Sequence, residues 1–73
     1  MDFTEALSLL RDGKRVTRRL WQDLDGRVGS WLEIADGPPF AGPALLVWQE
    51  DLQGFVPWAG AQNDVLQDDW ELA

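Results

Sequence analysis

Five tryptophans are spread along a chain of only 73 residues, and this density of large aromatic side chains most constrains the fold. Each tryptophan can bury roughly 150–250 Å² of surface, so together they supply much of a small core. A chain of this size buries only about 60% of its unfolded surface. It contains no cysteine for a disulfide or a thiolate metal site. We therefore expect a homo-oligomer, and a tightly packed, tryptophan-rich monomer is the alternative.

The absence of histidine as well as cysteine narrows the possible chemistry. These two residue types supply most nucleophile–base pairs and many metal ligands in enzymes. Carboxylates remain, and four of them are close together in sequence: Asp64, Asp68, Asp69 and Glu71. Their spacing matches no calcium-binding loop, so a solvated acidic face is the favoured interpretation. We expect no catalytic residue, no metal site and no cofactor, and hence a protein that is not an enzyme.

Charge is distributed unevenly along the sequence. Thirteen acidic residues against six basic ones give a formal net charge of −7. Five of the six basic residues fall between positions 11 and 19: Arg11, Lys14, Arg15, Arg18 and Arg19. An acidic chain repels polymeric nucleic acid, whereas one compact basic segment suits a small phosphorylated ligand. The alternative is that these cations lie at a solvated helix end and pair with acids elsewhere.

The sequence shows no membrane or export signal. No apolar run approaches the roughly 18 residues of a membrane-spanning helix. The segment 1–5 lacks the basic residues that begin a signal peptide. We therefore expect a soluble protein that does not bind a membrane.

The first residues predict a short helix. Four apolar residues have the spacing of one helix face: Phe3, Ala6, Leu7 and Leu10. Asp2 and Glu5 have the spacing of a capping box at its start. Gly13 is suited to the left-handed conformation that ends a helix.

Short β-prone runs and turns follow the helix. Strands are expected in five segments, residues 15–18, 27–35, 44–49, 55–58 and 69–72. A hairpin turn is expected at 23–26, irregular structure at 36–43, a turn at 50–54 and one helical turn within 61–67. The run 15–18 is expected to begin a sheet edge, and Pro57 favours an edge or strand end. The sequence thus predicts one α+β domain over residues 1–73, with a short N-terminal helix packed on a small, mostly antiparallel β-sheet.

Two tryptophans are candidates for a ligand site. Trp21 directly follows the basic segment, and Trp58 follows a proline at the end of an expected strand. An aromatic face beside arginines suits a nucleotide, because the base stacks on the ring while guanidinium groups bind the phosphates. The alternative is that the aromatic residues form the core, which is our expectation for Trp31, Trp48 and Trp70.

Motifs at both ends of the sequence, covering about half of the chain, carry a family resemblance. They are Phe3-Thr4-Glu5-Ala6-Leu7, Gly13-Lys14-Arg15-Val16-Thr17-Arg18, Trp21, Val56-Pro57-Trp58, Gln62-Asn63-Asp64-Val65-Leu66 and Asp69-Trp70-Glu71. In this order and spacing they resemble the second Thoeris anti-defence family of phages and bacteria. The sequence departs from the family at Ala61, where a serine or threonine is usual, and at Gln67, where an alanine is usual.

The resemblance implies a phage-encoded protein that acts in the host bacterial cytoplasm. Such proteins form homo-oligomers, commonly homotetramers, and sequester cyclic nucleotide signals of bacterial immune systems without cleaving them. The implied ligands are glycocyclic ADP-ribose of the Thoeris defence and, in some members of the family, cyclic oligonucleotides of the CBASS defence at a separate site.

Motif positions and side-chain chemistry together give the candidate ligand-binding residues. These are Phe3, Lys14, Arg18, Arg19, Trp21, Trp58, Gln62 and Asp64. We expect the aromatic rings to stack a base and the three cations, Arg18 foremost, to bind phosphates. Gln62 and Asp64 are expected to share hydrogen bonds with ribose hydroxyls or an adenine amino group. The alternative function is a small acidic oligomeric interaction module that inhibits a host protein, although such a module has no use for the basic segment.

Overall fold

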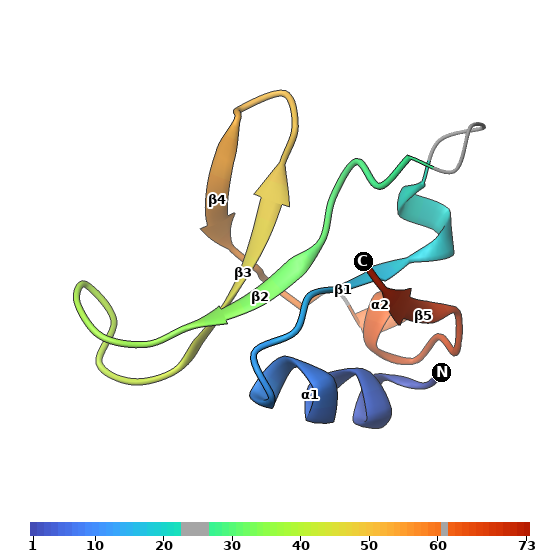
Figure 1. The fold of residues 1–73 in the computed structure, drawn as a ribbon, viewed down its shortest axis with the longest axis horizontal. Coiled ribbons are helices and arrows are strands. Elements are labelled where there is room, and N and C mark those ends of the chain that lie inside the picture. Colours follow the sequence, from blue (N-terminus) through green and yellow to red (C-terminus); the bar gives the residue numbers. More distant parts are fainter. Residues whose placement is uncertain (23–26, 61) are drawn as a thin grey trace.

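A five-stranded antiparallel sheet with a helix on one side forms the fold (Figure 1). The computed structural model describes residues 1–22, 27–60 and 62–73. Its helices are α1 (Phe3–Arg11), the 3₁₀ turn η1 (Arg19–Trp21) and α2 (Gln62–Val65). Its strands are β1 (Val16–Arg18), β2 (Leu32–Ala35), β3 (Ala44–Gln49), β4 (Gly54–Pro57) and β5 (Trp70–Leu72). The predicted α+β class, with an N-terminal helix and an antiparallel sheet, is confirmed.

Helix α1 begins and ends where its local signals predict. The Asp2 side chain accepts a hydrogen bond of 2.9 Å from the Glu5 backbone N–H at the N-terminus of the helix. Gly13 has a φ of +85° just beyond its end, a conformation that costs glycine little. The helix buries Ala6 and Leu10 and packs against β1, β2 and β5. Within the described ranges, no helix is long and apolar enough to cross a membrane.

The strand order is β4-β3-β2-β1-β5, which places β1 inside the sheet. The expectation that the 15–18 run begins an edge is therefore wrong. The reason is that the last strand returns to pair with it: Thr17 lies opposite Glu71 and Arg18 opposite Trp70. The outer strands are β4, which ends at Pro57 as expected for an edge, and β5.

Two further predictions differ from the structure in extent. The strand expected over 27–35 is regular only in β2, and Val28 forms an isolated bridge to Gln22. The predicted hairpin turn at 23–26 lies outside the described residues, as does Ala61 at the start of the expected helical turn. The predicted irregular segment 36–43, strand β3 and the short helix within 61–67 are confirmed.

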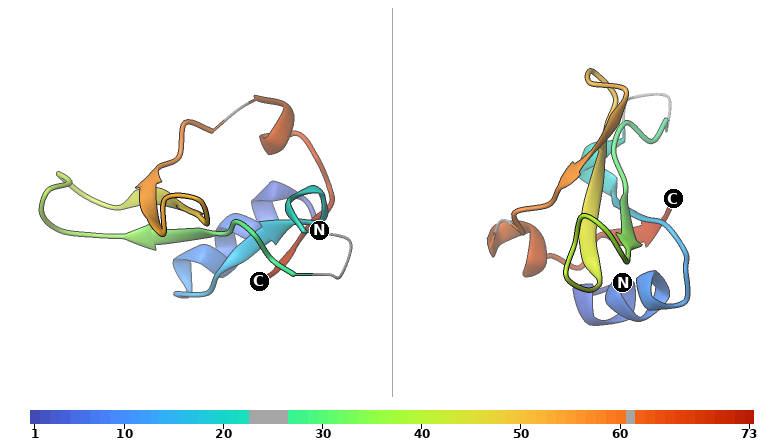
Figure 2. Two further views of the ribbon diagram at one scale, coloured as in Figure 1. Left: turned by 90° about the horizontal axis from the view of Figure 1, so that it is seen from above. Right: turned by 90° about the vertical axis from the view of Figure 1, so that its left-hand side faces the viewer.

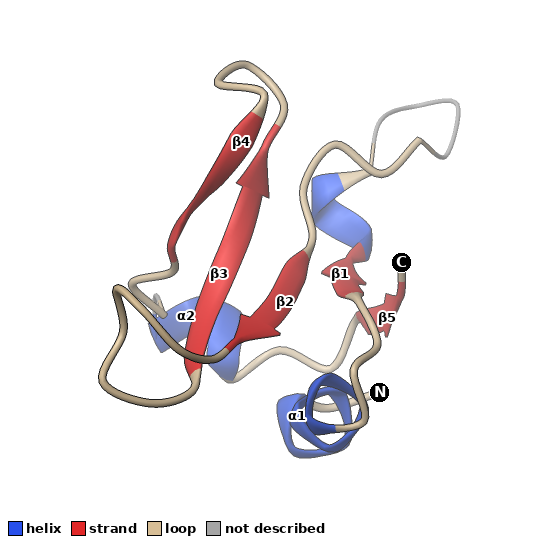
Figure 3. Cartoon of the chain, turned by 60° about the vertical axis from the view of Figure 1, so that its left-hand side comes forward, coloured by secondary structure: helices blue, strands red, loops and turns tan. Residues whose placement is uncertain are grey.

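The core lies between α1 and the sheet face that the helix covers. Its fully or almost fully buried apolar residues are Ala6, Leu10, Val16, Leu32, Val47 and Trp70. Two of them, Leu32 and Val47, are register partners on β2 and β3 and so share one face. Figures 2 and 3 show α1 beside β1 and β5, with the β3–β4 hairpin extending away from it.

Trp31 and Trp48 are not part of this core, which corrects the expectation for both. Each is half-buried, whereas Trp70 is fully buried as expected. Side chains alternate between the two faces of a strand. Trp31 precedes the core residue Leu32, and Trp48 follows the core residue Val47, so both rings belong to the face opposite α1.

Candidate functional site

Four aromatic side chains from distant parts of the chain meet at one end of α1, and we call them the Trp70 cluster: Phe3, Trp21, Trp58 and Trp70. The ring centroid of Trp70 lies 5.1 Å from that of Phe3, 5.3 Å from that of Trp21 and 6.0 Å from that of Trp58. Phe3 and Trp58 also contact each other at 5.7 Å. The two tryptophan contacts of Trp70 are edge-to-face, an arrangement that aromatic quadrupoles favour. The three predicted stacking residues therefore lie together, half-buried around a buried ring.

Arg18 lies beside this cluster and is held by two carboxylates. Its Nε and Nη2 donate to the two carboxylate oxygens of Asp69 at 2.8 and 3.2 Å, and its Nη1 donates to Asp64 Oδ1. Only 6% of Arg18 is exposed. The bond to Asp69 is the main cause that raises the pKa of Arg18, and the same bond lowers the pKa of Asp69. These groups therefore stay charged at neutral pH.

The tryptophan and the arginine are joined through the peptide backbone. Trp70 Nε1 donates a hydrogen bond of 3.1 Å to the carbonyl oxygen of Asp64. Arg18 and Trp70 are register partners on β1 and β5. Arg18 thus ties α2 and the start of β5 to β1, because its guanidinium bonds to one acid on each segment.

The remaining predicted residues are exposed, and Lys14 lies beyond the end of α1 that is opposite the cluster. Arg19 is exposed, and its Nε donates to Glu71 Oε1 at 2.9 Å, which lowers the pKa of Glu71. Gln62 is exposed on α2. Lys14 is exposed between α1 and β1, and its side chain forms no ion pair within residues 1–22, 27–60 and 62–73.

The basic segment, residues 11–19, had two interpretations, one as a site for phosphates and one as a group of cations that pair with acids elsewhere. The contacts of its residues agree partly with each. Arg15, Arg18 and Arg19 pair with acids far along the chain, as the solvated-face alternative expects. Arg11 and Lys14 have no such partner among the described residues. Arg18 faces two carboxylates, so its single charge is already compensated, and the exposed cations are better placed to meet an anion.

Sequence reasoning missed a second aromatic group, which we call the outer aromatic face: Trp31, Trp48 and Phe55. The indoles of Trp31 and Trp48 stack at 5.1 Å with an interplanar angle of 10°, and Phe55 packs edge-on to Trp48 at 5.2 Å. The Arg15 guanidinium carbon lies 5.1 Å from the Trp31 ring centre. The signal for this face was present in the alternation of tryptophans with core residues along 31–34 and 45–48.

Comparison with known proteins gives one family match. The family model for the Thoeris anti-defense 2-like domain matches residues 1–73. Comparison with curated proteins finds no match. The matched range includes the motifs at both ends of the sequence, and the chain belongs to the Thoeris anti-defense 2-like family, which gives it a role in phage anti-defence.

Proposed function

We propose that this anti-defence protein binds a cyclic nucleotide immune signal and withholds it from its receptor without cleaving it. The ligand is glycocyclic ADP-ribose, a CBASS cyclic oligonucleotide, or both, and the protein acts in the host bacterial cytoplasm. The observation that carries the proposal is the family match over residues 1–73. A protein that captures a signal needs a stable complex and no reaction.

The Trp70 cluster and its surroundings support binding. Phe3, Trp21 and Trp58 are each half-buried, and aromatic faces stack on any base. Arg19, in the same 3₁₀ turn as Trp21, offers an exposed cation for phosphates, and Lys14 offers another beyond the far end of α1. Arg18 acts mainly by positioning Asp64, whose remaining acceptor capacity suits hydroxyl or amino donors.

The ionisation of the same region disfavours one route to cleavage, which is general acid catalysis by its carboxyl groups. General acid–base chemistry needs a group whose pKa lies near the working pH. Arg18 holds the pKa of Asp69 below its ordinary value, and Arg19 does the same for Glu71. Both carboxylates therefore lack a proton to give at neutral pH.

We also propose that the protein is a homo-oligomer, with a tetramer as the expected form. The outer aromatic face supports this, because two stacked indoles and Phe55 lie on the side of the sheet that α1 leaves uncovered, bordered by Arg15 and Glu33. Light scattering should give a mass several times 8.3 kDa. The variant Trp48→Glu should shift the particle towards the monomer, because it places a charge within the apolar contact. A monomeric wild-type protein at micromolar concentration would contradict the proposal.

The experiment that tests sequestration combines titration with recovery of the ligand. Calorimetry with glycocyclic ADP-ribose and with a cyclic trinucleotide measures binding, and chromatography after heat denaturation shows whether the ligand is intact. We expect binding and full recovery. Degraded ligand would show an enzyme, and no binding to any cyclic nucleotide would favour the acidic interaction module.

Two arginine variants locate the binding surface. Arg19→Gln should weaken affinity roughly tenfold if Arg19 makes one charged hydrogen bond to phosphate. Arg27→Gln is the control, since Arg27 is also an exposed arginine but belongs neither to the basic segment nor to the Trp70 cluster. Equal affinities of the two variants would remove Arg19 from the site.

A further inference from the structure

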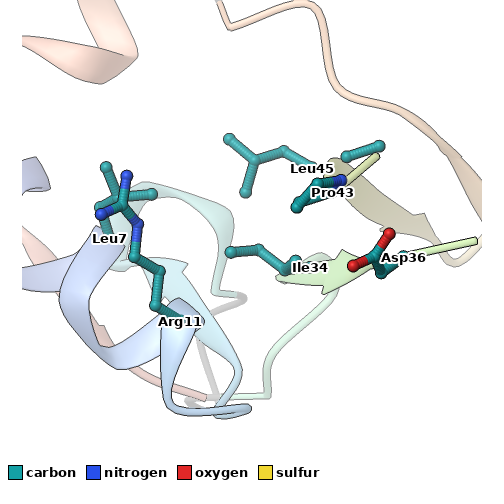
Figure 4. Close-up of a pocket in the computed structure, with 7 residues that line it drawn as sticks. Leu7, Arg11, Ile34, Asp36, Pro43 and Leu45 are labelled. Carbon is teal, nitrogen blue, oxygen red and sulfur yellow. The ribbon is translucent and has the colours of Figure 1, made fainter. Parts of the chain in front are cut away.

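The two faces of the sheet leave different surfaces for a partner. On the helix side a pocket of about 520 Å³ remains where α1 ends (Figure 4). Leu7 of α1 and Ile34 and Leu45 of the sheet line its apolar part, and the opposite charges of Arg11 and Asp36 lie on either side of it (Figure 4). A hollow with a charged rim is not a surface on which a second sheet can lie flat.

The outer aromatic face is a continuous row across three chain segments. The Trp48 N–H donates to the Trp31 carbonyl oxygen at 2.9 Å, and Trp48 is the register partner of Phe55, so the three rings lie side by side across the strands. Leu46 and Pro57 are also register partners, and each lies two residues from a ring of the row, so both are on the same face. Phe55 is 38% exposed. An apolar layer of this kind is what packs between two sheets.

The β4 edge of the sheet offers little to a partner strand. The Trp58 N–H donates to the Leu45 carbonyl oxygen at 3.0 Å, so Trp58 directs its backbone groups towards β3. Because this direction alternates along an antiparallel strand, Phe55 and Pro57 direct theirs outwards. Proline has no N–H, so among residues 54–57 the one outward donor is that of Phe55.

The β5 edge is partly covered by the chain itself. The Trp70 N–H donates to the Met1 carbonyl oxygen at 3.1 Å, and the Trp70 carbonyl oxygen accepts a hydrogen bond of 3.0 Å from the Met1 amino group. The Ala73 N–H faces β1, so among residues 70–72 the one unpaired outward N–H is that of Leu72. One donor on each edge is too few for a shared ladder, and copies of the chain therefore associate more favourably by a face than by an edge.

Charged residues lie on both sides of the aromatic row. Arg15 pairs with Glu33 and lies over the Trp31 ring, yet its side chain is 57% exposed, so its five donors are not all used. Glu50 lies two residues beyond Trp48, whereas Glu33 is opposite the residue two before it, so Arg15 and Glu50 are on opposite sides of the row. The hydrogen bond from the Trp48 indole lowers the pKa of Glu50, which is exposed and charged at neutral pH.

We propose that two copies of the chain pack face to face through the outer aromatic face, about a two-fold axis that brings Arg15 of each copy to Glu50 of the other. The proposal rests on the proposed homo-oligomer and adds the arrangement of its subunits. In a two-fold interface every contact occurs twice, so one surface must supply both partners of a pair. This surface does so, with an apolar centre between a cation and an anion. A second copy therefore fits it better than a partner of a single charge.

A charge exchange tests the arrangement, with particle mass measured by light scattering. Arg15→Glu and Glu50→Arg each place like charges opposite one another, so each variant alone should have half the wild-type mass or less. An equimolar mixture of the two variants pairs opposite charges again, and its mass should return to the wild-type value. Arg11→Glu is the control and should keep the wild-type mass, because it makes the same charge change on α1, across the sheet. Arg15 and Glu50 are exposed, so the fold should survive both changes, which melting curves verify.

The outcomes separate this arrangement from the proposed function. Wild-type mass in both single variants would overturn the arrangement while leaving the homo-oligomer standing. Loss of mass in each variant without recovery in the mixture would also overturn it, since Arg15 and Glu50 would then not meet across the interface. A monomeric wild-type protein would instead overturn the homo-oligomer, and the arrangement with it. Calorimetry with a cyclic nucleotide on the wild type tests sequestration separately.

Discussion

Trp70 and Trp48 lie in the same sheet, yet they belong to opposite environments. Trp70 is fully buried and is surrounded by Phe3, Trp21 and Trp58, with its N–H bonded to a backbone carbonyl. Trp48 stacks on Trp31 at the outer aromatic face, and its N–H donates 3.0 Å to the Glu50 carboxylate at the surface. The difference is that α1 covers one face of the sheet and no described element covers the other. Aromatic clusters of similar composition therefore lie in different environments, the first around a fully buried ring and the second at the surface of the sheet.

The largest effect on stability should come from removing the buried tryptophan. Trp70→Ala should lower the free energy of unfolding by about 3–5 kcal/mol, because it leaves a cavity and exposes three aromatic neighbours. Trp70→Phe should cost less, since it keeps one aromatic ring in the core and loses the other ring of the indole together with the hydrogen bond to the Asp64 carbonyl oxygen. Urea unfolding followed by circular dichroism measures both. A loss below about 1 kcal/mol for Trp70→Ala would show that the cluster is not the centre of the core.

Breaking the buried ion pairs should have the next largest effect. Arg18→Gln should destabilise the protein by about 1–3 kcal/mol, because Asp64 and Asp69 would then face each other without their shared cation. The side chains of these acids keep 18% and 28% of their surface exposed, so water moderates the cost. The double variant Arg18→Gln/Asp69→Asn should recover part of the loss. No recovery in the same unfolding assay would mean that Arg18 acts through packing alone.

Removing the exposed tryptophan should have a smaller effect that depends on protein concentration. Trp48→Ala should cost about 1 kcal/mol in the monomer, the lower end of the contribution of its two aromatic pairs, because the ring is only half-buried. If the outer aromatic face joins subunits, the stability of the wild-type protein increases with protein concentration and that of Trp48→Ala does not. The stability difference between the two proteins should therefore increase with protein concentration. The cost of Trp70→Ala should stay constant over the same range. If the stability losses of Trp48→Ala and Trp70→Ala change in the same way with protein concentration in melting curves, the proposed difference between the two clusters is wrong.

The smallest effect should be the pH dependence contributed by Asp69. Its pKa is lowered in the folded protein by the hydrogen bond from Arg18, against about 3.9 for an unfolded aspartate. The corresponding stabilisation is present above that unfolded value and is lost as the pH falls through the lower folded value. We expect acid unfolding below about pH 4 that is less steep in Asp69→Asn. Asp51→Asn, in the exposed β3–β4 turn, is the control, and an identical change in both variants would contradict the assignment to Asp69.

Sequence signals of short range predicted the elements with good accuracy. Each signal for α1 depends on residues within a few positions of one another. These signals are the N-terminal cap at Asp2, the spacing of the apolar residues and the glycine at position 13, and α1 begins and ends between that cap and that glycine. The proline-rich segment 36–43 and the strand that follows it depend on equally local chemistry. Two residues of the Trp70 cluster were also predicted from local features of the sequence. Trp21 directly follows the basic segment, and Trp58 follows Pro57 at the end of an expected strand.

The tertiary structure decided what depends on distant partners. Alternation along a strand separates two faces but does not tell which face a helix will cover, so Trp31 and Trp48 could not be distinguished from core residues. Arg18 finds its two acids 46 and 51 residues away, and β1 becomes an inner strand only because β5 returns to it. The pocket at Arg11 likewise exists only where the end of α1 meets the ends of β2 and β3. Local conformational preferences are set by neighbours in sequence, whereas burial and pairing are set by the segments that fold onto them.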